Sequence, residues 1–439
     1  MRLKKVIGLI LTMALLLSVF GCTAGKQQPA ADGTNKTDNS QQGQPPAQQP
    51  TAEKTKVQVI SWWDFTNSEP LKQLKAGFES KNPDLEIEYI QVGTGYADKV
   101  LAMIAGGGEL PDVMMLAMDK VPIFADKGAI LSLDKYVTNE YKNSLYPVVL
   151  NALTYNGSIY AVPRDITSKV MFLNKKMFDD AGVPYPDENW TWDDFRQIAK
   201  KLTKDNSQWG FYFPKYNDGF YHFLAQNGGG LVTPDGKASL LGKPESIEAL
   251  HFLQDMIIKD KSVPSESQAK QFGDSDSAPF IAGKVAMVAG GLATTVDLDK
   301  NNVEYLIRPL PVPKGKKPLS TAFVNAWAIP KGAKNPDLSW RVLDFFSSKD
   351  GQKVVLDTGM GLPASKDVDI SAFVQKRPDN KYLIESLEYS VPFPSPLHGV
   401  DFFKVVQQEF DLMWLGQRSV EDAVAAVEKV APDVLAGKK

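Results

Sequence analysis

The sequence predicts an α/β protein in which strands and helices alternate along most of the chain. Segments with a strand-like period of two are followed repeatedly by segments with apolar residues at helical spacing. The composition, 43% hydrophobic and 23% charged residues, is typical of a globular protein. The stretch from Val57 to Lys439 is too long for one ordinary domain, so we expect two lobes.

The alternation begins at the start of this stretch. Residues 57–60 read as a strand, and Pro70, behind Ser68, is typical of the first turn of a helix. Residues 85–89 alternate between apolar and polar side chains and predict a second strand. The intervening helix would bury one face, formed by Leu71, Leu74 and Phe78.

The next segments continue the pattern. A helix over residues 97–105 is expected to stop at the glycines 106–108. Residues 113–116 are short and wholly apolar, as in a buried parallel strand, and a further helix would end at Gly128. Asn156-Gly157 between apolar runs predicts a type I′ hairpin turn.

Two later helices carry start signals. Thr191 to Asp194 resembles a capping box, followed by apolar residues at helical spacing. Residues 419–422 repeat the device before Val424 and Val427. Alternating strands and helices favour mostly parallel sheets.

The N-terminus has the organisation of a secretory signal peptide, which we assign to residues 1–21. Basic residues precede an apolar run over residues 6–20, shorter than the roughly 20 residues of a membrane-spanning helix. Gly21 and Cys22, the only cysteine, follow directly. A single cysteine excludes an internal disulfide.

Cys22 stands where bacterial lipoproteins carry their lipidated cysteine. Residues 19–22 resemble the lipobox, although Phe20 departs from its usual small or branched residue. The resemblance implies lipidation of Cys22; the alternative is a plain signal peptide with an incidental cysteine. No Val, Ile, Leu, Met or aromatic residue occurs over residues 23–56, so we expect residues 22–54 to form a disordered tether.

Charge and motif content exclude several function classes. The formal net charge is -3, without a basic, aromatic-interleaved stripe, so no nucleic-acid partner is expected. The histidines His222, His251 and His398 lack metal-ligand spacing, and we expect no metal and no cofactor. No Gly-x-Ser-x-Gly or His-Glu-x-x-His motif is present.

Several segments, in one order, resemble the bacterial extracellular solute-binding proteins of sugar ABC importers (family 1, the maltose-binding-protein-like group). The resemblance covers nearly the whole chain after the tether. Its most recognisable stretch is Phe172-Leu173-Asn174-Lys175-Lys176-Met177-Phe178, then Ala181-Gly182-Val183 and Thr191-Trp192-Asp193-Asp194-Phe195. The other segments are 78–83, 105–113, 156–163, 280–287 and Gly290-Gly291.

This resemblance implies a periplasmic-binding-protein-like fold, with two discontinuous α/β lobes joined by a hinge around a ligand cleft. Lobe 1 would comprise residues 55–164 and 324–385, and lobe 2 residues 165–323 and 386–439. The protein would capture a carbohydrate outside the cytoplasm, anchored to the membrane through its lipid, as a monomer. It would deliver the sugar to the permease subunits of an ABC importer and perform no chemistry itself.

The chemistry of a sugar suggests where it would bind. A pyranose has an apolar face, which matches an aromatic ring, and a rim of hydroxyls, which matches Asp, Asn and Arg. Trp62, Trp63 and Asp64 follow the first strand, where open α/β sheets bind ligands. Adjacent strand residues point to opposite faces, so we expect one tryptophan in the core and favour Trp63 as the stacking ring.

The family resemblance extends this set. Asp119 and Lys120 resemble a family Asp-Arg pair that holds sugar hydroxyls, or form a charge pair at a helix start. Arg164 and Asp165 at the first crossing contact ligand, or form a structural salt bridge. The remaining expected contacts are Tyr216, Asn217, Gly290, Gly291, Asn325 and Trp327, with core packing as the alternative for Trp327. Leu292 replaces a tryptophan common in relatives.

Three other functions stay open from the sequence. The same fold could bind a non-sugar solute such as a glycerol phosphoester or a polyamine, or present sugar to a membrane sensor kinase. An extracytoplasmic glycoside hydrolase would need two carboxylates, which Asp64, Asp119 and Asp165 could supply.

Overall fold

The structure is a computed structural model, and it describes residues 54–64, 67–205, 207–272 and 276–438. The signal peptide over residues 1–21 and Cys22 lie outside the described residues, as does all but the last residue of the tether. Among the described residues, no helix combines the length and apolar character needed to cross a membrane.

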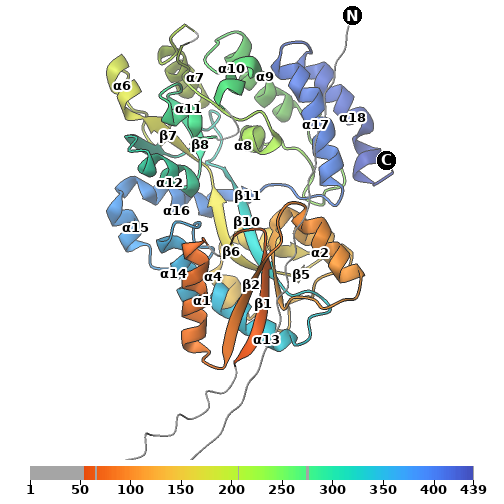
Figure 1. Cartoon of the computed structure of the whole chain (residues 1–439). Helices are drawn as coiled ribbons and strands as arrows, with labels where there is room; N and C mark the ends of the chain where they lie inside the picture. The colour runs from red at the N-terminus through yellow and green to blue at the C-terminus, as the bar shows by residue number, and fades with distance from the viewer. Residues whose placement is uncertain (1–53, 65–66, 206, 273–275, 439) are drawn as a thin grey trace, which may run out of the picture. The chain divides into compact units, whose positions relative to one another are not determined.

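A six-stranded sheet organises the N-terminal part of the chain (Figure 1). Its order is β11-β10-β3-β1-β2, with β6 paired along the opposite edge of β10 from β11 and β3. The strands are β1 (Thr55–Ser61), β2 (Leu85–Gln91), β3 (Val113–Ala117), β6 (Val162–Ser168), β10 (Ser320–Ala328) and β11 (Ser390–Pro392).

Both faces of the sheet are covered, and its strand β3 is apolar on both sides. In β3, Val113 and Met115 belong to one core cluster, and Met114 and Leu116 belong to another. The associated helices are α1 (Glu69–Lys81), α2 (Tyr96–Ala105), α3 (Val121–Asp126), α4 (Asn139–Ser144), α5 (Pro147–Leu153), α13 (Pro336–Ser347) and α14 (Lys349–Asp357). A short hairpin, β4 (Thr154–Tyr155) and β5 (Ser158–Ile159), precedes β6.

A second sheet has three strands in the order β8-β7-β9. They are β7 (Val170–Asn174), β8 (Met287–Gly290) and β9 (Tyr305–Arg308). A separate core cluster forms here, rich in phenylalanine and tryptophan. The helices of this part are α6 (Lys175–Ala181), α7 (Trp192–Lys201), α8 (Asn217–Asn227), α9 (Pro244–Ile258), α10 (Glu266–Ala269), α11 (Ala278–Ile281), α12 (Leu292–Lys300), α17 (Gly399–Trp414) and α18 (Val420–Leu435).

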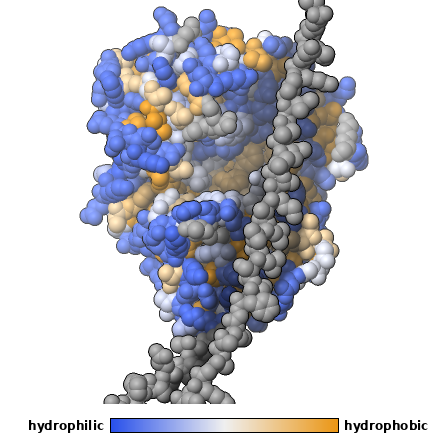
Figure 2. All heavy atoms as spheres, viewed as in Figure 1, coloured by the Kyte–Doolittle hydropathy of each residue, from blue (hydrophilic) through white to orange (hydrophobic). Residues whose placement is uncertain are grey.

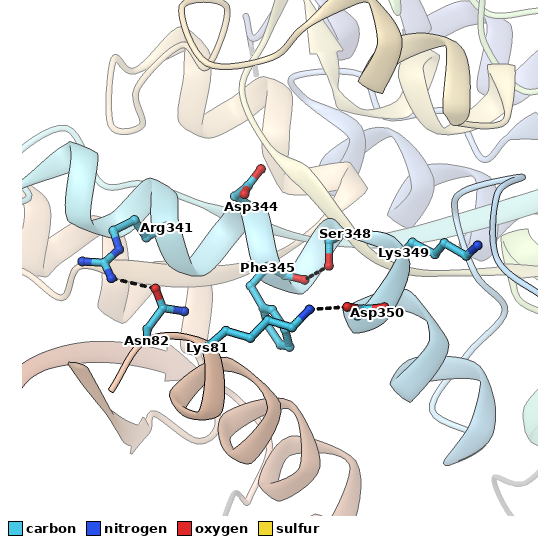
Figure 3. Close-up of a pocket in the computed structure, with 8 residues that line it drawn as sticks. All are labelled: Lys81, Asn82, Arg341, Asp344, Phe345, Ser348, Lys349 and Asp350. Atoms are coloured by element: carbon cyan, nitrogen blue, oxygen red, sulfur yellow. Dashed lines mark hydrogen bonds and ion pairs between the residues drawn. The ribbon is translucent and has the colours of Figure 1, made fainter. Parts of the chain in front are cut away.

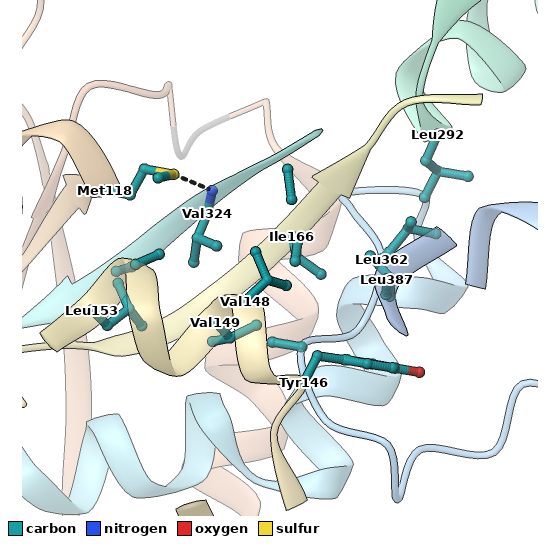
Figure 4. Packing of buried hydrophobic residues seen from close by; sticks show 14 of the residues in the cluster. Met118, Tyr146, Val148, Val149, Leu153, Ile166, Leu292, Val324, Leu362 and Leu387 are labelled. Carbon is teal, nitrogen blue, oxygen red and sulfur yellow. Dashed lines mark hydrogen bonds between the residues drawn. The ribbon is translucent and has the colours of Figure 1, made fainter. Parts of the chain in front are cut away.

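Three segments connect the two sheets and lie side by side. Strand β6 ends at Ser168 and the chain enters β7 two residues later. Ala322 of β10 pairs with Ser168 on one side and with Pro392 of β11 on the other. The apolar cluster of Figure 4 continues through this region, since it includes Leu292 of α12 together with Ile166 and Val324.

A fourth segment, with α15 (Ser371–Lys376) and α16 (Lys381–Glu385), lies in the range we assigned to lobe 1. Its polar contacts reach α12 and β9, because Arg377 binds Asp299 and Asp379 binds Arg308. Lys381 also pairs with Glu188. The lobe boundaries therefore stay predictions, and this segment is the one to test.

The local predictions hold at several positions. Helix α1 buries Leu71, Leu74 and Phe78, and Thr191 and Asp194 complete a capping box at α7. Asn156 and Gly157 have φ values of 48° and 83°, the positive angles that a type I′ turn requires.

The expectation of mostly parallel sheets is wrong. Pairs β1–β2, β1–β3 and β10–β11 are parallel, whereas β10 runs antiparallel to both β3 and β6. Both pairings of the second sheet are also antiparallel. The reason is that β10 returns from the second sheet and enters the first against the direction of β3.

Candidate functional site

The two tryptophans follow β1 directly, in a bend rather than on the strand itself. Ser61 Oγ accepts a hydrogen bond of 3.0 Å from the Trp63 amide and so fixes the start of the bend. The Trp62 ring packs edge-on against Tyr96, with centroids 5.2 Å apart. Both indoles remain half-buried, and Asp64 is exposed, with its carboxylate 2.7 Å from Asn67 Nδ2.

The Trp63 ring is covered on one face by Arg164, whose guanidinium carbon lies 4.0 Å from the ring centroid. A guanidinium over an indole face is attracted by the negative charge of the ring face. Arg164 Nε donates to Asp165 Oδ2, and both side chains are about 1% exposed. The structure therefore favours the structural salt bridge that the sequence left open at the first crossing.

A β-bulge places Arg164 in this position. In the pairing of β6 with β10, Asn325 lies opposite Asp165, whereas Ala326 lies opposite Pro163. Arg164 is the extra residue between them, and a bulge redirects its side chain. On a regular strand, Arg164 and Asp165 would point to opposite faces.

Three further residues hold this ion pair in place. Asn325 Nδ2 donates to Asp165 Oδ1 at 3.0 Å, and Gln352 Nε2 donates to the Arg164 carbonyl at 2.8 Å. At Gly361, a Cβ atom would lie 2.5 Å from Asp165 Cβ, so only glycine fits there. Gln352 and Gly361 were missed because nothing in their sequence surroundings distinguishes them from ordinary helix and loop residues.

Asp119 and Lys120 lie in a 3-10 helix directly after β3 and pair with each other at 2.8 Å. Their side chains are about one-third exposed, so both carry polar atoms that face solvent. Asn325 pairs with Ala117, which brings the end of β3 beside the bulge.

Residues from the second sheet approach the same strand, β6. At Gly291, a Cβ would meet Thr167 Cγ2 at 2.7 Å and the Ser168 carbonyl oxygen at 2.9 Å. A Cβ at Gly290 would lie 2.3 Å from Thr294 Oγ1. Both glycines are thus required by close packing, in addition to any contact with a ligand.

The N-terminus of α8 carries the other predicted contacts. Tyr216 is 44% exposed and donates to Asp276 Oδ2 at 2.6 Å; desolvation and this carboxylate raise its pKa. Asn217 Nδ2 donates to the Phe403 carbonyl, while Asn217 Oδ1 is buried without a hydrogen-bond partner among the described residues. Lys169, which follows β6, pairs with Asp218 at 2.8 Å and links α8 to the crossing.

Trp327 does not belong to this set. It is fully buried in the core between the first sheet and α13, with its ring 5.2 Å from that of Phe346. The period of two on β10 explains its position, since Ala326 and Ala328 face the opposite cluster. The expected second aromatic wall is therefore wrong at this position, and core packing is correct.

Two buried bases near α8 lie outside the set of predicted contacts. Burial lowers the pKa of Lys215 to about 7, and its Nζ lies 4.2 Å from the Phe213 ring centroid. His222 is 1% exposed, and neither ring nitrogen has a hydrogen-bond partner among the described residues. Burial and the nearby Lys169 charge lower the pKa of His222 well below its usual value.

Two hollows elsewhere do not involve the predicted residues. One, of about 350 Å³, lies between α1, α13 and α14, where Lys81 pairs with Asp350 and Arg341 with Asn82 (Figure 3). The other, of about 550 Å³, lies near Tyr305 and Arg377.

Hydrophilic side chains dominate the outer surface in the view of Figure 2. Within the described ranges, no group of three or more His, Cys, Asp or Glu side chains is placed to hold a metal ion.

The fold agrees with the comparison to known proteins. The family described as "Bacterial extracellular solute-binding protein" matches residues 62–353. This match covers more than half of the chain, which therefore belongs to the bacterial extracellular solute-binding protein family.

Individual relatives are distant but cover much of the chain. It is 26% identical over 313 residues to the maltooligosaccharide ABC transporter solute-binding lipoprotein of Streptococcus pneumoniae, spanning 69% of this chain and 70% of that protein. It is 21% identical over 402 residues to the maltodextrin-binding protein of Bacillus subtilis, spanning 90% and 88%. Its structure is similar, with a TM-score of 0.76 and 25% identity, to a Listeria monocytogenes ABC substrate-binding protein in complex with cycloalternan, covering 88% of this chain and 100% of the other.

Proposed function

We propose that this protein captures a carbohydrate outside the cytoplasm and delivers it to the permease subunits of an ABC importer. The observation that carries the proposal is the half-buried Trp63, with one face covered by Arg164, at the carboxyl end of β1 where β6 and β10 cross. The part of the ring that stays exposed is an aromatic surface of the kind that matches the apolar face of a pyranose. Family membership and the names of the relatives support the same class of ligand.

In this proposal, the sugar contacts partly or fully exposed side chains at Trp62, Trp63, Asp64, Asp119, Lys120 and Tyr216. Asn217, Gly290 and Gly291 stay proposed contacts from the sequence, although Asn217 Oδ1 and Gly291 are buried in this structure. Arg164 and Asp165 are buried and act behind the surface, and Asn325 binds Asp165 from β10.

The proposal includes the location and state of the protein. Cys22 carries the lipid anchor, residues 22–54 tether the folded part to the membrane, and the protein works as a monomer without catalysing a reaction. A relative that is described as a lipoprotein supports the anchor. Metabolic labelling with a radioactive fatty acid tests it, since label should be present in the wild type and absent in Cys22→Ser.

Thermal unfolding of the full chain against a panel of solutes tests the ligand class. The panel comprises maltooligosaccharides, galactooligosaccharides, monosaccharides, amino acids, polyamines and glycerol phosphoesters. A ligand at a hundred times its dissociation constant adds about 2.7 kcal/mol to the unfolding free energy, which raises Tm by several degrees. We expect this rise with an oligosaccharide.

Other outcomes of the panel have definite meanings. A rise only with a polyamine or a glycerol phosphoester would overturn the carbohydrate assignment and leave a binding protein for that solute. Chromatography of the incubated sugar shows whether it is recovered intact. Its cleavage would replace the binding role by a hydrolase.

A further inference from the structure

Arg164 lies between two groups that have different roles in the proposed site. On one side its guanidinium covers the ring of Trp63, and on the other its Nε binds the carboxylate of Asp165. With about 1% of its surface exposed, Arg164 has no face left for a sugar in this structure. An arginine that is buried and bound on both sides fixes the orientation of its neighbours.

The geometry around Arg164 restricts its side chain from several directions. The bulge in β6 changes the face of the strand to which the Arg164 side chain points. Its Nη1 lies 2.9 Å from Met115 Sδ on β3, and Gln352 Nε2 holds its backbone carbonyl at 2.8 Å. Asp165 is held in turn by Asn325, so the chain of contacts runs from β10 through β6 to the ring after β1.

Trp63 itself is less restricted. It lies in the bend past the end of β1, where Ser61 holds its backbone amide and its half-buried ring packs against the edge of a core cluster. Its ring therefore depends on side-chain contacts for its orientation. The Arg164 guanidinium supplies such a contact on one face of the ring, at 4.0 Å.

We infer that Arg164 is a positioning residue, which holds the Trp63 ring in the orientation that stacks on sugar and is itself aligned by Asp165 and Asn325. This inference rests on the proposed function only for its ligand. The orientation of Trp63 without ligand follows from the structure alone and can be measured separately.

The first experiment requires no ligand. The near-UV circular dichroism and the acrylamide quenching of tryptophan fluorescence are measured. The contribution of Trp63 to each signal is the difference between the protein and its Trp63→Phe variant. Arg164→Met should change this contribution and increase its quenching about twofold or more. An unchanged Trp63 contribution in folded Arg164→Met protein would overturn the inference.

The second experiment is a double-mutant cycle on sugar binding, with maltotetraose as the probe and calorimetry as the readout. Arg164→Met should weaken binding roughly tenfold in the wild-type background. In the Trp63→Ala background, Arg164→Met should change the affinity little, because the ring through which Arg164 acts on the sugar is absent. A full tenfold loss in both backgrounds would show that Arg164 acts independently of Trp63 and overturn the inference.

Two further variants keep the test interpretable. Arg341→Met removes an exposed arginine bound to Asp84 and Asn82 and is the matched control, expected to change neither readout. If Arg164→Met fails to fold, Asp165→Asn keeps the side-chain shape and should give the same changes at smaller amplitude. If maltotetraose does not bind to the wild type, the proposed ligand fails, while the spectra still decide the role of Arg164.

Discussion

At the scale of single residues, His222 has an unusual environment in the middle of α8. Its ring is 1% exposed and its nitrogens have no hydrogen-bond partner among the described residues. Burial, and then the Lys169 charge, lower its pKa well below the usual value of 6.5. The folded protein therefore keeps His222 neutral at pH values where the unfolded chain binds a proton.

The sign of the pH effect follows from this difference. A depressed folded-state pKa contributes stability above pH 6.5, which is lost progressively as the pH falls below that value. We predict that His222→Phe reduces the fall in unfolding free energy between pH 7 and pH 5 by about 2 kcal/mol. Urea unfolding at both pH values measures it. His398 is exposed, and His398→Phe should leave the fall in unfolding free energy unchanged. If it reduced this fall as much as His222→Phe does, the pH effect could not be assigned to His222.

Residue identities predicted the site only in part. The sequence pointed to Trp63, Arg164, Asp165 and Asn325, and the structure brings these four together. It could not distinguish ligand contacts from support, because burial of Arg164 and Asp165 depends on a bulge that no local pattern signals. Trp327 failed for a similar reason, since the register of β10 decides which side chain enters the core.

At the scale of elements, helix α1 protects the open edge of the first sheet. Among the described strands, β2 is the last on that side, so its outward backbone groups have no strand beside them there. Glu79 Oε1 accepts from the Ile87 amide at 2.9 Å, and Lys75 Nζ donates to the Ile87 carbonyl at 2.6 Å. Such covering of edge groups opposes strand-to-strand aggregation.

We predict that Glu79→Ala lowers the unfolding free energy by about 1 kcal/mol, since the Ile87 amide loses its acceptor. Hydrogen exchange at that amide should accelerate roughly fivefold or more. Glu79→Gln retains a carbonyl acceptor at the same position and is the matched control. Equal exchange rates in the Ala and Gln variants would show that the contact does not protect the edge.

Elements were more predictable than their arrangement. Caps, turns and the buried face of α1 depend on residues close in sequence, so the patterns at Thr191, Ser419 and Asn156-Gly157 were sufficient. Strand direction depends on where the chain returns after long excursions. For this reason β10, the strand that returns from the second sheet, was the main error of the parallel-sheet expectation.

At the scale of the whole molecule, three connecting segments meet around Ser168, Ala322 and Pro392. The candidate site lies next to them, because Asp165 and Asn325 belong to two of these segments. A ligand that contacts Trp63 is therefore connected to β6 through the Arg164 side chain. Asp165 on the same strand continues the connection to Asn325 on β10. A ligand can shift a conformational equilibrium here only through contacts that differ between the states.

The resemblance to a family predicted the fold class better than the local patterns did, because the order of several motifs carries information on distant segments that a single motif does not. The resemblance did not indicate the contacts of residues 371–385, which we assigned to lobe 1. In this segment Arg377 binds Asp299 and Lys381 binds Glu188, and both partners lie in the range assigned to lobe 2.

We expect Trp63 to stack on a bound carbohydrate, and titration calorimetry of the full chain with maltotetraose measures this contact. Binding should be measurable in the wild type and should weaken roughly tenfold to a hundredfold in Trp63→Ala. Trp340→Ala, which removes a tryptophan stacked on Tyr136 outside the site, should bind as the wild type does. Equal affinities of wild-type and Trp63→Ala protein would contradict the claim.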